Sequence, residues 1–327
     1  MIAALFCPKR RTMDPTILEP PQADPKIIFV LGMHRSGTSV LAHTINLMGA
    51  HVGDDSELLP AHSDVNPTGY WERADIVAEH DRFLQANGFA WATVANFAIE
   101  RIEENWRHNL AAELQSIVRR IAHPDSSLVI KDPRLCLMLP VWQEFVAAPA
   151  HVVVVRDPRK IAASLMAAFP NSFTTDFLLA LWQKYMQSAL SALAGKRVLF
   201  VSYARMLENW EEEHHRLWCG LNELGVAGLS NFDTDKLSSV LDSRLDRSEP
   251  SPHARMDDDQ QWLFHWLEQR CEAEGPVEVV DVPEVSSPDS ILLELEKVRL
   301  TCMHNGWVMA ANKGGPPPPR LLIAQTA

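Results

Sequence analysis

A short apolar run, a glycine-rich loop and an amphipathic stretch together constrain the fold of this chain more than any other feature. Residues 27–31 (IIFVL) suit a buried strand, residues 32–39 (GMHRSGTS) form the loop, and residues 38–48 carry apolar side chains at helical spacing. In this order of strand, loop and helix, the loop amides and the helix N-terminus can bind a phosphate or a similar anion. The sequence therefore predicts an anion-binding turn at the carboxyl end of a parallel strand.

The loop carries an unusual cation. Nucleotide triphosphatases end such a loop with Gly-Lys-Ser/Thr. Here Gly37 is followed by Thr38, and the basic residue, Arg35, lies two positions before Gly37. This arrangement moves the fixed charge and argues against ordinary chemistry of ATP with magnesium. Glycine-rich turns that bind nothing are also common, so the loop alone leaves both interpretations open.

Four apolar runs separated by helical patterns predict the architecture. The runs, residues 27–31, 128–130, 151–155 and 198–203, are typical of buried parallel strands. The helical patterns cover residues 38–48, 74–85, 105–122, 140–147, 159–169, 174–193 and 206–224. Their alternation predicts a doubly wound α/β fold, with three layers (α/β/α) and a central parallel sheet. Because ligands of such sheets bind at the carboxyl ends of the strands, we expect the loops that follow the first three strands to meet in one cleft.

The sequence is expected to divide at about residue 250. Residues 1–25 carry five prolines and predict a flexible lead, and residues 26–250 hold the α/β pattern. Beyond them, helical patterns at 257–273 and 288–304 precede a low-complexity tail, KGGPPPPR, at 313–320. We therefore expect a helical C-terminal extension with a proline-rich tail over residues 251–327.

The composition limits the partners and the compartment. The 30 lysines and arginines stand against 42 aspartates and glutamates, a net charge of −12, so broad attraction to nucleic acid or to an anionic membrane is not expected. The five cysteines are scattered without a CxxC pair, which is typical of reduced thiols and argues against structural zinc. No apolar run approaches the ~20 residues of a membrane span, and the N-terminus does not have the pattern of a signal peptide. We expect a cytoplasmic protein with a local basic pocket.

Two more strand ends carry basic residues, each followed by an Asp-Pro-Arg turn. Lys131 ends the second apolar run and precedes the turn at 132–134, and Arg156 ends the third run and precedes the turn at 157–159. Two such turns in one chain suggest a shared anionic ligand. The alternative is coincidental turn chemistry, in which the arginines form surface pairs with neighbouring aspartates.

The helix expected after the third run adds a hydroxyl to this set. Arginine suits bidentate contact with phosphate, so Arg156 is a candidate phosphate ligand. Ser164, eight residues later, falls near the second turn of that helix and can add a neutral donor. Asp157 is expected to cap the helix that Pro158 opens.

A carboxylate follows two aromatic residues in the segment NPTGYWE, residues 66–72. Tyr70 and Trp71 could line an acceptor pocket in which Glu72 acts as a base. Alternatively, the two aromatic side chains belong to the core and Glu72 caps the helix that begins at Ala74.

In combination, the motifs GMHRSGTS, NPTGYWE, KDPRL and VVRDPR-x4-S resemble the sulfotransferase family over residues 27–225. The resemblance is closest to bacterial members and to the carbohydrate and tyrosylprotein branches. It implies a P-loop-like α/β fold related to nucleotide kinases, the donor 3′-phosphoadenosine 5′-phosphosulfate, and no metal. The cytosolic small-molecule branch has a histidine after the second strand, where this chain has Lys131, so that branch is disfavoured.

The resemblance also implies roles for individual residues. The loop residues Arg35, Ser36, Gly37, Thr38 and Ser39 would hold the 5′-phosphosulfate of the donor. Arg156 and Ser164 would bind its 3′-phosphate. Arg35, Lys131 and Glu72 would be catalytic: the two cations would neutralise the bridging oxygen, and Glu72 would be the base. The Arg-Lys-Gly motif of the family is missing near the C-terminus, where Arg244 and Arg247 are candidate substitutes.

We therefore expect a sulfotransferase that acts on a hydroxyl of a carbohydrate or a small molecule. A nucleotide or small-molecule kinase, and a non-catalytic nucleotide-binding or scaffold protein, are the alternatives. The aromatic residues Tyr70, Trp71, Trp91 and Trp106 could stack on an acceptor or belong to the core. The enzymatic prediction requires that Arg35, Lys131 and Arg156 lie around one site.

Overall fold

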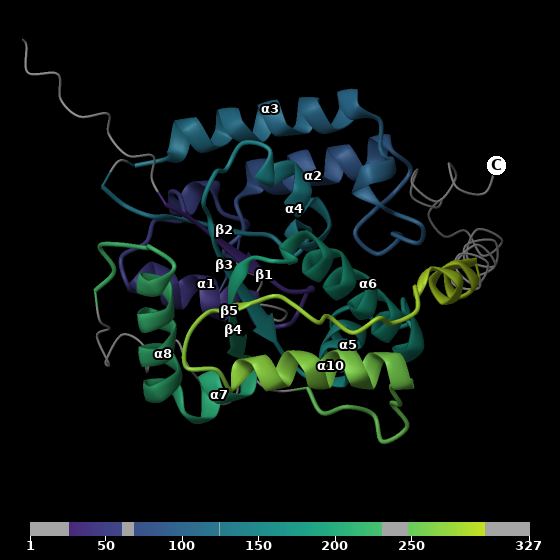
Figure 1. Cartoon of the computed structure of the whole chain (residues 1–327). Helices are drawn as coiled ribbons and strands as arrows, with labels where there is room; N and C mark the ends of the chain where they lie inside the picture. The colour runs from purple at the N-terminus through teal and green to yellow at the C-terminus, as the bar shows by residue number, and fades with distance from the viewer. Residues whose placement is uncertain (1–25, 61–68, 124, 231–247, 298–327) are drawn as a thin grey trace, which may run out of the picture.

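The computed structural model describes residues 26–60, 69–123, 125–230 and 248–297. In this part of the chain, five strands form one sheet in the order β2-β1-β3-β4-β5 (Figure 1). The strands are β1 (Ile27–Leu31), β2 (Leu128–Lys131), β3 (Ala150–Val155), β4 (Arg197–Ser202) and β5 (Val277–Glu278). The first four are parallel, as the apolar runs predict, and β5 joins β4 in the antiparallel direction.

Helices cover both faces of the sheet (Figure 1). They are α1 (Thr38–Leu47), α2 (Ala74–Ala86), α3 (Glu104–Ile121), α4 (Leu135–Gln143), α5 (Pro158–Ala168), α6 (Thr175–Leu193), α7 (Tyr203–Glu208), α8 (Trp210–Glu223) and α10 (Asp258–Cys271). Short 3₁₀ helices lie at Asp55–Glu57 and Ile99–Arg101, and residues 289–297 are helical.

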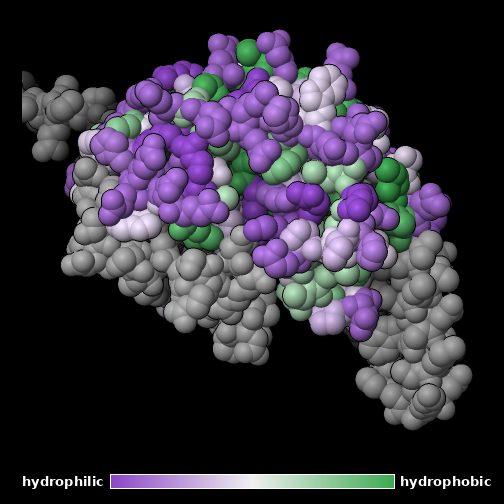
Figure 2. Space-filling model, turned by 90° about the horizontal axis from the view of Figure 1, so that it is seen from below, coloured by the Kyte–Doolittle hydropathy of each residue, from purple (hydrophilic) through white to green (hydrophobic). Residues whose placement is uncertain are grey.

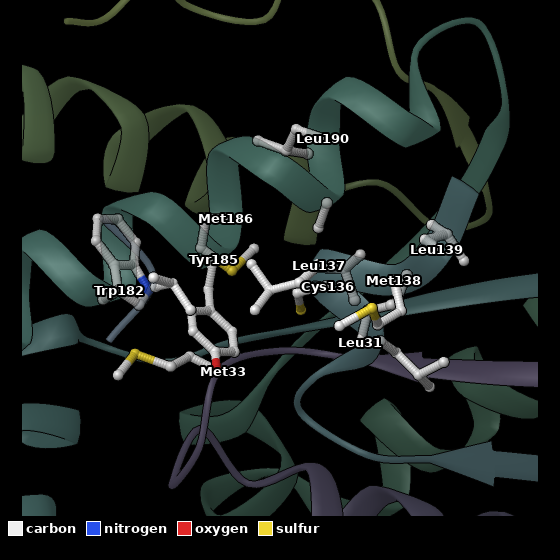
Figure 3. Packing of buried hydrophobic residues seen from close by; sticks show 14 of the residues in the cluster. Leu31, Met33, Cys136, Leu137, Met138, Leu139, Trp182, Tyr185, Met186 and Leu190 are labelled. Atoms are coloured by element: carbon white, nitrogen blue, oxygen red, sulfur yellow. The ribbon is translucent and has the colours of Figure 1, made fainter. Parts of the chain in front are cut away.

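Each face of the sheet has its own hydrophobic cluster, because successive strand residues point to opposite sides. Phe29 and Leu31 of β1 pack with α2, α3, α4, α6 and α10, whereas Ile28 and Val30 pack with α1 and α8. Figure 3 shows the first cluster where α4 and α6 meet the end of β1. The predicted three-layer α/β/α fold is therefore confirmed.

Two helix predictions are wrong in their boundaries. The helix expected at 140–147 is α4, which begins at Leu135 and contains Pro140. Its apolar residues are buried on all sides, so they lack the amphipathic period that indicates a helix. Pro140 is a residue type typical of a helix N-terminus, so it wrongly predicts that the helix begins there. The single helix expected at 206–224 is divided at Asn209 into α7 and α8.

The described part of the C-terminal segment belongs to the same core. β5 pairs with β4, with Val277 opposite Val198, and α10 packs against β3, β4 and α6. Leu263, Trp266 and Cys271 of α10 are buried in the first cluster. The division of the chain at residue 250 stays a prediction.

The surface on the side of α10 is mainly hydrophilic, with isolated hydrophobic residues between the polar ones (Figure 2). Scattered apolar residues of this kind are normal on a protein surface. Among the helices of the described ranges, none combines the length and the apolarity that crossing a membrane requires.

Candidate active site

The loop between β1 and α1 is a tight turn at the carboxyl edge of the sheet. The Ser36 hydroxyl and amide both donate to the Met33 carbonyl, at 2.7 and 3.1 Å. Arg35 has a φ of 68° and Gly37 a φ of 100°, both left-handed. A Cβ on Gly37 would lie 2.1 Å from the ring of Tyr203, so only glycine fits there.

Arg35 joins the loop to β3 and α5. Its Nε donates to the Ser164 hydroxyl at 3.0 Å, and Arg156 Nη1 donates to the Arg35 carbonyl at 2.6 Å. The guanidinium of Arg156 also lies 4.7 Å from the ring centre of Tyr203. The two arginines and the serine that the sequence assigns to the donor are therefore in direct contact.

The surroundings of Arg35 favour an anion. Burial, and then the positive charge of Arg156, lower the pKa of Arg35. Within the described part of the chain, no carboxylate forms an ion pair with its guanidinium. A bound anion would offset both the burial of this charge and the repulsion between the two arginines.

A second pair of candidate residues is in contact at the end of β2. Lys131 Nζ lies 2.6 Å from Glu72 Oε1, and both side chains are buried. Burial raises the pKa of Glu72, and the charge of Lys131 opposes this effect. The alternative that Glu72 caps α2 is wrong, since the N-cap residue is Arg73.

The segment that carries Glu72 is held by α1 and by residues on either side of it in the sequence. The Ser39 hydroxyl donates to the Tyr70 carbonyl at 3.0 Å. On the other side of Glu72, the buried Arg73 pairs with Glu57 and Asp75 at 2.7 and 2.8 Å. Ser39, assigned to the donor from the sequence, thus also anchors this segment.

His34 lies in the electrostatic surroundings of both groups of charged residues. Burial holds the pKa of His34 well below its ordinary value, and nearby charges modify the effect. These charges are Arg134, Lys131 and Arg35, which lower it further, and Asp132, which opposes them. Lys131 and Arg35 therefore both lie in the electrostatic surroundings of one loop histidine. Arg35 and Arg156 are in direct contact and Lys131 ends β2, the strand beside β1, but the assignment of the three cations to one site stays a prediction.

The second arginines of the two Asp-Pro-Arg turns each pair with a carboxylate. Arg134 pairs with Asp132 at 3.0 Å and with Asp81 of α2 at 2.7 Å. Arg159 pairs with Asp157 at 2.6 Å. Lys131, the first basic residue of its strand end, is likewise paired with Glu72, and the suggestion of a shared anionic ligand stays a prediction. Asp157 caps α5 by accepting from the Arg159 amide, as expected.

A buried chain of hydrogen bonds fixes the turn after Lys131. Trp142 Nε1 donates to His80 Nε2 at 3.1 Å, and His80 Nδ1 lies 2.8 Å from Asp132 Oδ2. Indole is only a donor, so Nε2 is unprotonated and the neutral His80 donates from Nδ1. Burial would raise the pKa of Asp132, but Arg134 and His80 hold it far below its ordinary value.

Aromatic side chains form a wall beside His34. The ring centre of Trp91 lies 4.6 Å from that of His34, and Phe169 and Phe173 lie 5.9 and 5.7 Å from Trp91. Phe169 is 44% exposed and the nearby Met166 is 39% exposed. We call the three aromatic residues Trp91, Phe169 and Phe173, together with the neighbouring Met166, the aromatic wall. Trp106, in contrast, lines a groove between α2 and α3.

A pocket of about 320 Å³ adjoins the ends of β3 and β4. Arg156 and Tyr203 line it on the side of the sheet, and Phe264, Glu268 and Glu272 line it on the side of α10. Tyr203 was missed from the sequence, although its place directly after β4 follows the same strand-end rule. Arg244 and Arg247 lie outside the described residues.

No cluster of three or more histidine, cysteine, aspartate or glutamate side chains within the described ranges is arranged to hold a metal ion. The expectation that the protein uses no metal stays a prediction.

Comparison with known proteins gives a family and several similar chains. The sequence model described as "Sulfotransferase family" matches residues 25–223, more than half of the chain. The nodulation protein NoeE of Sinorhizobium fredii (strain NBRC 101917 / NGR234) is 26% identical over 251 residues, which cover 68% of this chain. The chain spans only 57% of the length of that relative.

Two solved structures have sequence identities below 20%. The sulfotransferase domain of the olefin synthase from Synechococcus PCC 7002 is 16% identical, with 76% of this chain and 97% of that chain covered and a TM-score of 0.41. Sulfotransferase STF1 from Mycobacterium tuberculosis H37Rv is 12% identical, with 76% and 77% covered and a TM-score of 0.40.

Proposed function

The chain belongs to the sulfotransferase family, and we propose that it transfers a sulfuryl group from 3′-phosphoadenosine 5′-phosphosulfate to an acceptor hydroxyl. One observation carries the proposal. The loop arginine Arg35 contacts Arg156 and Ser164, and the buried pair of Glu72 and Lys131 lies beside the same loop. Two arginines, a hydroxyl and a buried carboxylate therefore lie at the carboxyl edge of the sheet, which supports the proposal.

The residues present fit the phosphosulfate end of this donor. The loop has left-handed backbone at Arg35 and Gly37 and opens helix α1, so its amides and the helix N-terminus can bind an anion. We propose that Arg35, with Ser36, Gly37, Thr38 and Ser39, holds the 5′-phosphosulfate. Arg156 and Ser164 would hold the 3′-phosphate.

The pocket beside α10 is proposed to hold the adenosine end. Arg156 lines this pocket and also donates to the loop carbonyl of Arg35. One residue therefore adjoins both regions that a doubly phosphorylated adenylate must reach. A volume of about 320 Å³ lies within the usual range for small-molecule pockets, about 300–1,000 Å³.

The donor supplies a sulfuryl group of single negative charge, and the protein supplies position and charge stabilisation. Glu72 would take the proton of the acceptor hydroxyl. As the new S–O bond forms, the bond from sulfur to the phosphate oxygen breaks, and Arg35 and Lys131 would stabilise the charge on that oxygen. The products are a sulfate ester and 3′-phosphoadenosine 5′-phosphate.

We propose that the acceptor is a carbohydrate that lies against the aromatic wall. The wall adjoins His34 of the loop, and Phe169 and Met166 expose apolar surface there. Flat aromatic side chains suit the apolar face of a sugar ring, while its hydroxyls remain free for polar contacts.

Two experiments test the proposal. Calorimetric titration with 3′-phosphoadenosine 5′-phosphate, beside ATP with magnesium, should give binding of the first only. Tight binding of ATP with magnesium alone would favour a kinase, and binding of neither would favour a scaffold. A screen of p-nitrophenyl glycosides with ³⁵S-labelled donor should then yield a labelled sugar, and label on simple phenols alone would overturn the carbohydrate assignment.

A further inference from the structure

A histidine of α1 packs face to face against the residue before Glu72. The ring centres of His43 and Trp71 are 3.9 Å apart and the ring planes are inclined by only 20°. His43 Nδ1 is buried and has no hydrogen-bond partner among the described residues. Burial lowers the pKa of His43 to about 4, so the ring is neutral near pH 7. The histidine therefore acts at this place as a flat, uncharged surface.

Trp71 has a conformation that needs such support. Its φ is 58°, in the left-handed region that bulky residues rarely adopt. Residues in this region persist only where the surrounding structure holds them, and they gather at functional sites. The left-handed backbone at Trp71 immediately precedes Glu72, so it sets the direction in which that carboxylate leaves the backbone.

The contacts from α1 come from one face of the helix. Ser39 and His43 are four residues apart and therefore lie above one another. Ser39 bonds the Tyr70 carbonyl, and His43 packs on the ring of Trp71. The N-cap residue of the same helix is Gly37 of the loop. Two consecutive residues before Glu72 are thus held by the helix that the phosphate-binding loop opens.

We propose that His43 is a positioning residue, which acts through Trp71 to hold Glu72 against Lys131 and in register with the loop. The inference rests on the proposed function, because it takes Glu72 as the base. It adds to that function a specific coupling: the helix that carries the donor loop also sets the position of the base.

The test compares His43→Ala, His43→Leu and His43→Phe, each alone and combined with Glu72→Gln. Turnover is followed as release of 3′-phosphoadenosine 5′-phosphate, with the best p-nitrophenyl glycoside or, if none accepts, with water. A misplacement of about 1 Å can cost about 10²-fold in rate, so His43→Ala and His43→Leu should lower kcat by about 10- to 10²-fold. His43→Phe keeps a flat ring and should retain kcat near that of the unchanged protein.

Two readouts separate positioning from a general loss of structure. The calorimetric affinity for 3′-phosphoadenosine 5′-phosphate should not change in any His43 variant. In the Glu72→Gln background, His43→Ala should have no further effect on kcat, because both changes act through the same carboxylate. His215→Ala is the matched control, since its ring packs on Trp218 of α8, outside the site.

The outcomes distinguish this inference from the function on which it rests. Normal turnover of His43→Ala beside a slow Glu72→Gln would overturn the role of His43 alone. An equal loss from His43→Ala in both backgrounds would do the same, and if the alanine variant does not fold, His43→Leu answers the question. Normal turnover of Glu72→Gln, or no binding of the nucleotide, would overturn the proposed function as well.

Discussion

The ammonium group of Lys131 lies 2.6 Å from a carboxylate oxygen of Glu72, and the side chains of both residues are buried. The two residues are 59 positions apart and come from different elements, the end of β2 and the segment before α2. The pair therefore ties the excursion between β1 and β2 to the carboxyl edge of the sheet, where the loop lies. Its integrity affects both stability and the proposed chemistry.

Removal of one partner should destabilise the protein strongly. Breaking a buried ion pair leaves an uncompensated charge, which typically costs about 3–5 kcal/mol. We predict that Lys131→Ala lowers the free energy of unfolding in urea by about this amount. The double variant Lys131→Met/Glu72→Gln should recover most of the loss. A cost below about 1 kcal/mol, as for an exposed pair, would contradict the buried arrangement.

The rate of transfer should depend on the ionisation of Glu72. Burial raises the pKa of Glu72, with Lys131 opposing, and only the ionised form can act as a base. Turnover should therefore fall as the pH falls through this raised pKa, at a higher pH than for an ordinary glutamate. Glu72→Gln should lower kcat by about 10²–10⁴-fold and abolish this acid limb, with donor affinity nearly unchanged.

The raised pKa of Glu72 also affects stability, but here the loss comes as the pH rises. A carboxyl group whose pKa is higher in the folded state favours folding while it is protonated, and this contribution is lost as the pH rises through the folded pKa. Between the ordinary and the raised pKa, the unchanged protein should therefore lose stability relative to Glu72→Gln as the pH rises. A constant difference in urea unfolding across this range would contradict the raised pKa.

The sequence was sufficient for the parallel part of the fold. Strands β1 to β4 are buried along nearly their whole length, so each appears as a continuous apolar run with few alternatives. β5 has only two residues, one of them exposed, and gives no such run. Its place at the edge depends on how α10 packs against β4, which is a tertiary effect.

The site was predictable wherever a strand end fixes the place of a side chain. Arg35 and Arg156 follow neighbouring parallel strands, so their proximity follows from the fold. The pairing of Arg134 with Asp81 was not predictable, because the carboxylate comes from α2 on a long excursion. A sequence cannot show whether a cation at a strand end is neutralised by such a residue or left for a ligand.

Arg156 should discriminate between nucleotides by their 3′-phosphate. A hydrogen bond to a charged group contributes about 1.5–3 kcal/mol, which corresponds to about 10- to 10²-fold in affinity. We predict that Arg156→Ala weakens the binding of 3′-phosphoadenosine 5′-phosphate by about this factor, as measured by calorimetry. The binding of adenosine 5′-phosphate should weaken much less, because it loses only the support that Arg156 gives to the Arg35 carbonyl and the Tyr203 ring.

The matched control for this prediction is Arg197→Ala. Arg197 lies at the amino end of β4, away from the carboxyl edge of the sheet, and its exposed side chain is paired with Glu223 at 3.1 Å. Its removal should change the affinity for both nucleotides little and equally. If Arg156→Ala weakened both nucleotides to the same extent, its assignment to the 3′-phosphate would be wrong.

The close contact of Gly37 with Tyr203 should make residue 37 far less tolerant than another left-handed glycine. Gly88 has a φ of 81° with nothing within 4 Å of an added Cβ, so Gly88→Ala should cost only the conformational term, about 1–2 kcal/mol. Gly37→Ala adds a clash at 2.1 Å with the Tyr203 ring, so it should cost more in urea unfolding and abolish nucleotide binding. Because Tyr203→Ala removes the clash, the double variant should be more stable than the sum of the two single changes predicts. Equal costs for Gly37→Ala and Gly88→Ala would show that the loop does not pack on Tyr203 as described.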